Sequence, residues 1–143
     1  MIVRTFAVTA LLALAAGCAS APADRAATSA KAEQELELAR LHAAEPVSRV
    51  RFLRPMDSFE VISDRAIVVW ETPFKAWLVE LRESPACTRL DNELGLGFDI
   101  MSGDSLSTTA GWVVGRNGLR CKMDSIREID VPAWRDAKRT AGL

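Results

Sequence analysis

The amino-acid sequence predicts an α+β domain, built mainly on an antiparallel β-sheet that curls into a small barrel or sandwich, with a short C-terminal helix. From about residue 48, short apolar or alternating segments follow one another and are separated by turn residues, as in an antiparallel meander. Asn117-Gly118 lies between two such segments and is a strong β-hairpin signal. Pro132 follows the last segment and favours the start of a helix that carries Trp134.

Most of the predicted strands are short and alternate between apolar and polar residues. The run Ala66–Trp70 is apolar throughout, which predicts a central strand buried on both faces. A helical turn is expected within residues 87–95, and a turn is expected at Gly103-Asp104. The strands are expected at residues 49–53, 58–62, 66–70, 76–81, 98–101, 108–114 and 119–129.

The first 17 residues have the layout of a secretory signal peptide. Arg4 supplies a positive start, and an uncharged, mainly apolar stretch from Phe6 to Ala16 follows it. This stretch is too short to cross a hydrocarbon layer of about 30 Å as a helix. The alternative is an N-terminal helix that stays attached as an anchor, but the stretch ends at small residues and a cysteine, which favours cleavage.

The segment Ala15-Ala16-Gly17-Cys18 resembles the lipobox of bacterial lipoproteins, with Ala15 at the position where Leu is usual. The resemblance implies cleavage before Cys18 and a diacylglyceryl group on its sulfur, commonly with a further acyl chain such as palmitate on the new amine. Several buried chains, at about 0.8 kcal/mol per methylene, make detachment from the membrane negligible. The residue after the cysteine is Ala19, not Asp, which implies sorting to the outer membrane, with the domain facing the periplasm.

Residues 18–47 are predicted to form the lipidated N-terminus and a tether. The part from Asp24 to Ala44 has high helix propensity, and Glu45-Pro46 would end a helix. Its apolar stripe is thin, so we expect weak packing and a partly helical linker, of about 90 Å if extended and about 40 Å if mostly helical. A short coiled-coil partner helix is the alternative. The stripe consists of Ala32, Leu36, Ala39 and Ala43.

The globular domain is therefore expected at residues 48–135, followed by a polar tail at residues 136–143 that frays. A chain of 143 residues suits one domain. A core of about 95 residues is only marginally stable, so a covalent staple would help it.

Cys87 and Cys121 are the two cysteines outside the lipobox. In an oxidising compartment an even pair normally forms a disulfide, and closing a loop of about 35 residues would contribute about 3–4 kcal/mol. A redox centre or a zinc site is the alternative. The sequence has no Cys-x-x-Cys motif and only one histidine, so both are disfavoured.

Residues 45–134 resemble an uncharacterised family of small proteobacterial lipoproteins, described only as a domain of unknown function. Trp77 stands where this family often has Tyr. The resemblance implies export, lipidation and a paired Cys87–Cys121, and it implies no activity, ligand or catalytic residue. The segments that carry it are residues 64–70, residues 76–81, Cys87 with Leu90, and residues 121–130.

No catalytic or cofactor-binding motif is found in the sequence. The only histidine, His42, lies in the tether, which argues against a serine hydrolase. Gly95-Leu96-Gly97 is too short for a phosphate loop. A net charge of −1 with scattered basic residues excludes a nucleic acid as the binding partner. No metal or cofactor is expected either. Paired carboxylates for glycoside chemistry are the remaining enzymatic option. No motif marks such a pair, and the carboxylates considered for it are Asp57, Glu60, Asp99 and Asp104.

Three residues are candidates for ligand or partner binding. Trp112 near a hairpin and Trp134 on the last helix could be contact anchors, although core filling is the preferred interpretation of both. Arg65 could belong to a polar binding spot, but an ion pair with a carboxylate such as Asp130 is preferred. The leading hypothesis is a non-enzymatic envelope binding or assembly accessory module with a periplasmic protein or cell-wall partner. The alternative is a protein inhibitor or stress factor acting on a periplasmic enzyme.

Overall fold

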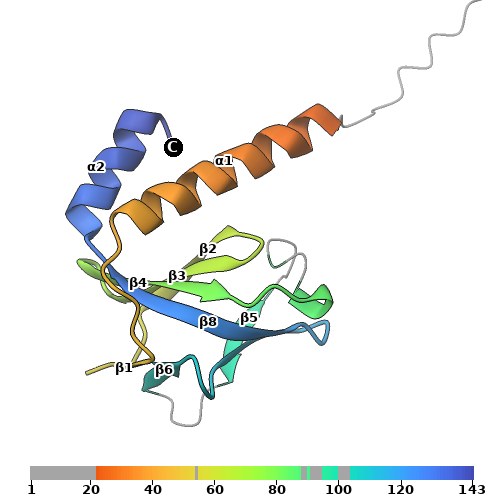
Figure 1. Ribbon diagram of the computed structural model, residues 1–143, viewed down its shortest axis with the longest axis vertical. Helices are drawn as coiled ribbons and strands as arrows, with labels where there is room; N and C mark the ends of the chain where they lie inside the picture. Colours follow the sequence, from red (N-terminus) through yellow and green to blue (C-terminus); the bar gives the residue numbers. More distant parts are fainter. Residues whose placement is uncertain (1–21, 54, 88–89, 91–94, 100–103) are drawn as a thin grey trace, which may run out of the picture.

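The computed structural model describes residues 22–53, 55–87, 90, 95–99 and 104–143 (Figure 1). Among these residues a long helix comes first, strands follow, and a second helix ends the chain. The elements are α1 (Pro22–Leu41), β1 (Arg49–Arg51), β2 (Ser58–Ser63), β3 (Ala66–Thr72), β4 (Lys75–Leu81), η1 (Pro85–Cys87), β5 (Leu96–Asp99), β6 (Ser105–Ser107), β7 (Trp112–Gly115), β8 (Arg120–Ile129) and α2 (Val131–Ala141).

A six-stranded antiparallel sheet with the strand order β2-β3-β4-β8-β7-β5 curls into a half-barrel (Figure 1). Both helices lie on one side of this sheet, and the separate β1–β6 ribbon lies on the other side. The predicted α+β class, with a curled antiparallel sheet and a C-terminal helix, is confirmed.

Strands β2, β3 and β4 form the predicted meander. Ile67 on β3 is opposite Val61 on β2 and Val79 on β4. The chain then departs from a meander, because β4 pairs next with β8, which is ten residues long. Strand β8 also pairs with β7, so it joins the two halves of the sheet.

The sheet carries an apolar core on each face. Ile67 and Val69 point into the curl and belong to the same core as Leu106 of the β1–β6 ribbon. Ala66 and Val68 point to the other face and pack beneath the helices. All four β3 side chains are fully buried. The prediction of a central strand buried on both faces is therefore confirmed.

Helix α1 packs on the sheet, so the expectation of weak packing is wrong. Leu36 and Ala39 are fully buried and join the core of the helix-covered face. After the helix, Ala43 forms a bridge with Ile129, which holds the connecting segment against β8 as well. The thin stripe is sufficient because Leu38 and Ala43 are also partly buried against the same core. The N-terminal part of α1 extends past the sheet (Figure 1).

Ion pairs along α1 add to this packing. The guanidinium of Arg40 lies 2.5 Å from the carboxylate of Glu80 on β4, and Ser125 of β8 donates to the same carboxylate. The hydrogen bond to Glu80 raises the pKa of Arg40, against the lowering effect of burial, so this cation stays charged. A pattern of apolar residues does not reveal ion pairs of this kind. For this reason the sequence predicted a loosely packed tether.

Helix α2 continues to Ala141, so most of the segment predicted as a frayed tail is helical. Asp130 caps its start by accepting the Ala133 N–H at 3.1 Å, and Pro132 lies in its first turn. Gly142 ends it in the left-handed region, at φ 72°. Lys138 lies 2.6 Å from Glu35 of α1, and this ion pair holds the last turns in place.

The predicted strand at residues 108–114 is shorter than expected. Strand β7 begins only at Trp112, because the Gly111 N–H donates to the Ser107 carbonyl at 2.7 Å and closes a turn. A Cβ at Gly111 would clash with that carbonyl and with the sulfur of Met123, so the turn requires glycine. Ser105–Ser107, before this turn, forms β6.

The other turn predictions have different outcomes. Gly118 has φ 81° in the β7–β8 hairpin, as the Asn117-Gly118 signal predicts. A helical turn lies at Pro85–Cys87, at the start of the region predicted for one. Residues 88–89 and 91–94 of that prediction, residues 100–101 of the predicted strand 98–101 and Gly103 of the predicted turn lie outside the described residues. In the described part of the chain, no helix is both long and apolar enough to cross a membrane.

Candidate functional site

A pocket with three cationic side chains and one tryptophan lies where β7 and β8 meet the segment after β4. Its volume is about 310 Å³, within the range of sites for small ligands. The side chains that line it are Arg82, Ser84, Trp112, Arg120 and Lys122.

The strand register places this pocket on the outer face of the half-barrel. Trp112 is opposite Lys122 across the β7–β8 pair. The next pair, Val113 and Cys121, is fully buried in the core inside the curl. Because neighbouring residues on a strand point to opposite faces, Trp112 and Lys122 point outward. The indole is partly exposed there.

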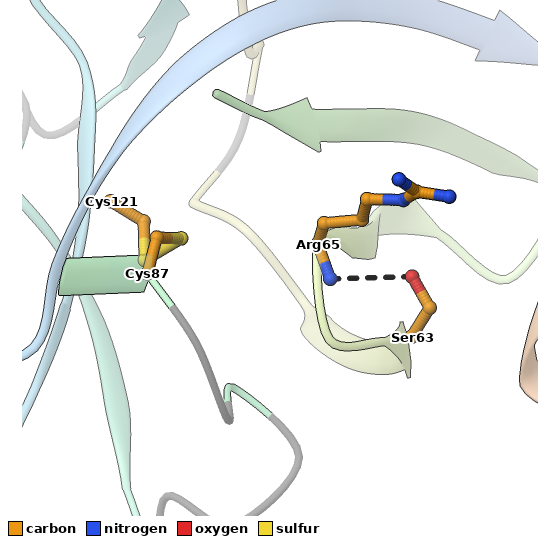
Figure 2. Close-up of a disulfide and its surroundings, with 4 residues drawn as sticks. All are labelled: Ser63, Arg65, Cys87 and Cys121. Atoms are coloured by element: carbon orange, nitrogen blue, oxygen red, sulfur yellow. Dashed lines mark hydrogen bonds between the residues drawn. A yellow bond between two sulfur atoms is a disulfide. The ribbon is translucent and has the colours of Figure 1, made fainter. Parts of the chain in front are cut away.

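A disulfide joins the two walls of the pocket. Cys87 on η1 and Cys121 on β8 are bonded, with their Cα atoms 5.1 Å apart, as predicted (Figure 2). The Cys87 N–H donates to the Ser84 carbonyl at 2.9 Å, and the Arg82 N–H donates to the Lys122 carbonyl at 2.8 Å. The segment that carries Arg82 and Ser84 is therefore attached to β8 both by hydrogen bonds and by the disulfide.

The charges at the pocket are mainly positive. Arg120 pairs with Asp99 at 2.9 Å and Arg82 pairs with Asp124 at 3.3 Å, and all four side chains are more than half exposed. The ammonium of Lys122 donates to the Thr109 carbonyl.

Two of these cations also contact the indole. The guanidinium of Arg120 lies 4.7 Å from the ring centroid of Trp112, and the Lys122 nitrogen lies 4.9 Å from it. Contacts of this kind help to hold a cation over an aromatic face. The indole thus orders a positively charged surface, which suits the binding of an anion.

Of the three residues considered for binding, Trp112 lines the pocket, whereas Trp134 and Arg65 do not line it. Trp134 is fully buried between α2 and the sheet, so it belongs to the core. Arg65 pairs with Glu33 of α1 at 2.9 Å, and its backbone N–H donates to the Ser63 hydroxyl (Figure 2). The preferred interpretation of Arg65, an ion pair with a carboxylate, is confirmed, but the suggested partner is wrong. The carboxylate is that of Glu33, because the Asp130 carboxylate caps α2. Cys18 lies outside the described residues.

Sequence reasoning missed the cations around Trp112. Arg120 and Lys122 flank Cys121 on an alternating strand, so a shared outward face could have been inferred for them. Arg82 and Ser84 had no such signal, because only the pairing of β4 with β8 brings them to the pocket.

A second hollow, of about 470 Å³, lies between the end of α1 and the end of β8 and contains His42. It is wide open, and backbone pairing crosses it: the Asp130 N–H donates to the His42 carbonyl, and the Ala44 N–H donates to the Glu128 carbonyl, both at 2.8 Å. These groups are satisfied within the protein, so the hollow offers little to a ligand.

Glu71 is a buried carboxylate, a feature that often marks a catalytic site. Burial raises its pKa, but the hydrogen bonds from Lys75, Trp77 and Leu53 outweigh this effect, and the net pKa is lowered. The Lys75 nitrogen is 3.1 Å away and the Trp77 indole nitrogen is 3.3 Å away. Glu71 is therefore fully paired and structural. Among the described residues, no group of three or more His, Cys, Asp or Glu side chains could hold a metal ion.

Comparison with known proteins identifies a family but no activity. A family model described as "Family of unknown function (DUF6491)" matches residues 1–142. No curated protein and no solved structure matches the chain.

Proposed function

The chain belongs to this family of unknown function, and from that premise we propose that it is an outer-membrane-anchored periplasmic lipoprotein that acts as a non-enzymatic envelope binding or assembly accessory module. The observation that carries the proposal is the pocket around Trp112, a pre-formed, positively charged cavity fixed by a disulfide. Its partner is a periplasmic protein or a cell-wall component.

The position of α1 supports a defined geometry for the anchored domain. Cys18, the expected lipid site, precedes Pro22, the first residue of the helix, by only a few residues. A helix of 20 residues is about 30 Å long, and the C-terminal half of α1 packs on the sheet. The free part of the helix then serves as a short spacer, and the domain stays near the membrane.

The experiment is crosslinking of the full-length lipidated protein in intact envelopes, followed by affinity capture. We expect a defined envelope component to be enriched with the wild-type chain and lost with Trp112→Ala. Arg139→Ala is the matched control, because Arg139 is 78% exposed on α2 and pairs with Asp136 in its own helix. Capture that does not depend on Trp112 would refute the pocket as the binding site.

The second candidate function is the inhibition of a periplasmic enzyme by a protruding apolar element. The turn between β3 and β4 carries Phe74, which is 79% exposed, and Leu53 is 93% exposed. The Leu53 N–H approaches the carboxylate of Glu71 at the end of β3, so both apolar side chains lie at the same end of the sheet. Capture of an enzyme that is lost with Phe74→Ala and retained with Trp112→Ala would favour this function.

A further inference from the structure

We propose that the pocket around Trp112 binds an anionic saccharide, whose carboxylate or phosphate group pairs with Lys122, Arg120 and Arg82. The inference rests on the proposed function and adds the chemical class of the ligand.

The lining of the pocket is the first argument. Its three charged side chains are all cations, and its other two members are a serine hydroxyl and an indole. A cavity lined in this way favours a ligand that brings a negative charge, because every charged side chain in its lining is a cation. The carboxylates Asp99 and Asp124 approach Arg120 and Arg82 from outside this lining.

The weakness of these two ion pairs is the second argument. In both pairs every side chain is more than half exposed, and the Arg82–Asp124 distance is 3.3 Å. Exposed pairs of this kind contribute little to stability, because water screens them. An incoming acid group can therefore replace Asp99 or Asp124 at little cost, and a guanidinium can hold it with two parallel hydrogen bonds.

Lys122 is the third argument. Its ammonium contacts the Thr109 carbonyl and the ring of Trp112, and neither group carries a charge. These two contacts orient the ammonium without neutralising it. Lys122 is therefore poised for an anion, and it contributes most of the specificity for an acidic ligand over a neutral one.

The size and composition of the cavity indicate a sugar. A volume of about 310 Å³ exceeds what a bare phosphate or carboxylate group fills. The indole offers an apolar surface with a polar edge, and the Ser84 hydroxyl can donate and accept hydrogen bonds, as a sugar hydroxyl requires. Three cations, two of them paired, are too few to follow the backbone of a nucleic acid.

The test is isothermal titration of the full-length lipidated protein in neutral detergent. The probes are trigalacturonate for a carboxylate, maltotriose 1-phosphate for a phosphate, and maltotriose as the neutral sugar. We expect at least one acidic probe to bind, maltotriose to bind at least about tenfold more weakly, and salt to weaken the binding. The stronger acidic probe identifies the acid group.

Variants of Lys122 separate charge from shape. Lys122→Gln should weaken the acidic probe about tenfold or more, Lys122→Arg should retain most of the affinity, and Arg139→Gln should change nothing. Thermal melting of each variant verifies the fold. Equal affinity for maltotriose or an unchanged affinity in a folded Lys122→Gln would overturn the inference. Tighter binding of single-stranded DNA than of either acidic sugar would overturn it as well. If no sugar binds but the capture of an envelope component still depends on Trp112, the proposed ligand class is wrong and the proposed binding function stands.

Discussion

The rings of Phe59 and Phe98 meet edge to face, with their centroids 5.6 Å apart and their planes at 79°. Phe59 lies on β2 and Phe98 lies on β5, and these are the two outermost strands of the six-stranded sheet. The curl of the sheet thus brings its two ends close enough for side chains to touch. An aromatic contact bridges the half-barrel at the point where a closed barrel would have a strand pair.

We expect this contact to stabilise the curl. Phe59→Ala and Phe98→Ala should each destabilise the domain, and together they should show a coupling energy of about 0.5–1.5 kcal/mol. The measurement is urea unfolding of the two single variants and the double variant. Phe74→Ala is the control, because Phe74 is 79% exposed, and it should change the unfolding free energy by less than about 0.5 kcal/mol. If the losses of unfolding free energy in Phe59→Ala and Phe98→Ala simply add up in the double variant, the two rings do not stabilise each other and this contact does not hold the curl.

Helix α1 should contribute to the stability of the domain. Leu36 is fully buried on it, so Leu36→Ala should lower the unfolding free energy by about 2–5 kcal/mol through lost burial and a residual cavity. Leu41→Ala on the same helix is the matched control, because Leu41 is 75% exposed and should cost little. Urea unfolding measures both. If both variants lose the same small amount of unfolding free energy, α1 is a free tether in solution.

The fold could be predicted to the extent that local patterns determine it. Alternating or continuous apolar segments between turn residues predicted β2, β3, β4 and β8, and the Asn117-Gly118 pair predicted the hairpin between β7 and β8. The pairing of β4 with β8 could not be predicted, because it joins segments that are far apart in the sequence. The packing of α1 was missed for a similar reason, since the ion pair between Arg40 and Glu80 also joins segments that are far apart in the sequence.

The candidate site was predicted only in part. The aromatic content of the chain drew attention to Trp112 and Trp134 alike, because a sequence pattern does not show which indole is covered. The structure buries Trp134 under α2 and leaves Trp112 beside three cations. The disulfide, in contrast, followed from the number of cysteines and their expected compartment.

Glu71 should make the stability of the domain dependent on acidic pH. Its folded pKa is lowered from an ordinary value of 4.5, because the hydrogen bonds and the charge of Lys75 outweigh burial. A lowered folded pKa stabilises the native state at pH values above the unfolded pKa. This contribution should be lost as the pH falls from about 4.5 through the folded pKa.

The measurement is urea unfolding at a series of pH values from neutral to acidic. Glu71→Gln should cost about 1–3 kcal/mol at pH 7 and make the acidic limb of the stability profile less steep. The neutral amide still accepts from Trp77 but no longer attracts Lys75. Glu60→Gln, at an exposed position on β2, is the control and should preserve the profile. An acidic limb that is unchanged in Glu71→Gln would disprove this role.

The disulfide should act on the pocket as well as on stability. Replacing both Cys87 and Cys121 with Ser avoids an unpaired thiol and removes a link across 34 residues, which should cost about 3–4 kcal/mol. The wall that carries Arg82 and Ser84 would then be held to β8 by hydrogen bonds alone, such as that from the Arg82 N–H to the Lys122 carbonyl. We therefore expect the affinity for an acidic sugar to fall as well.

Leu36→Ala is the appropriate comparison, because it lowers stability by a similar amount at a position in the other core, under α1. Isothermal titration under conditions where both variants are folded should show near-normal affinity for Leu36→Ala and a loss of about tenfold or more for the double serine variant. We expect this difference because the disulfide ties the segment that carries Ser84 to the strand that carries Lys122, whereas Leu36 lies in the other core. Equal affinities in the two variants would mean that the disulfide stabilises the domain without shaping its binding site.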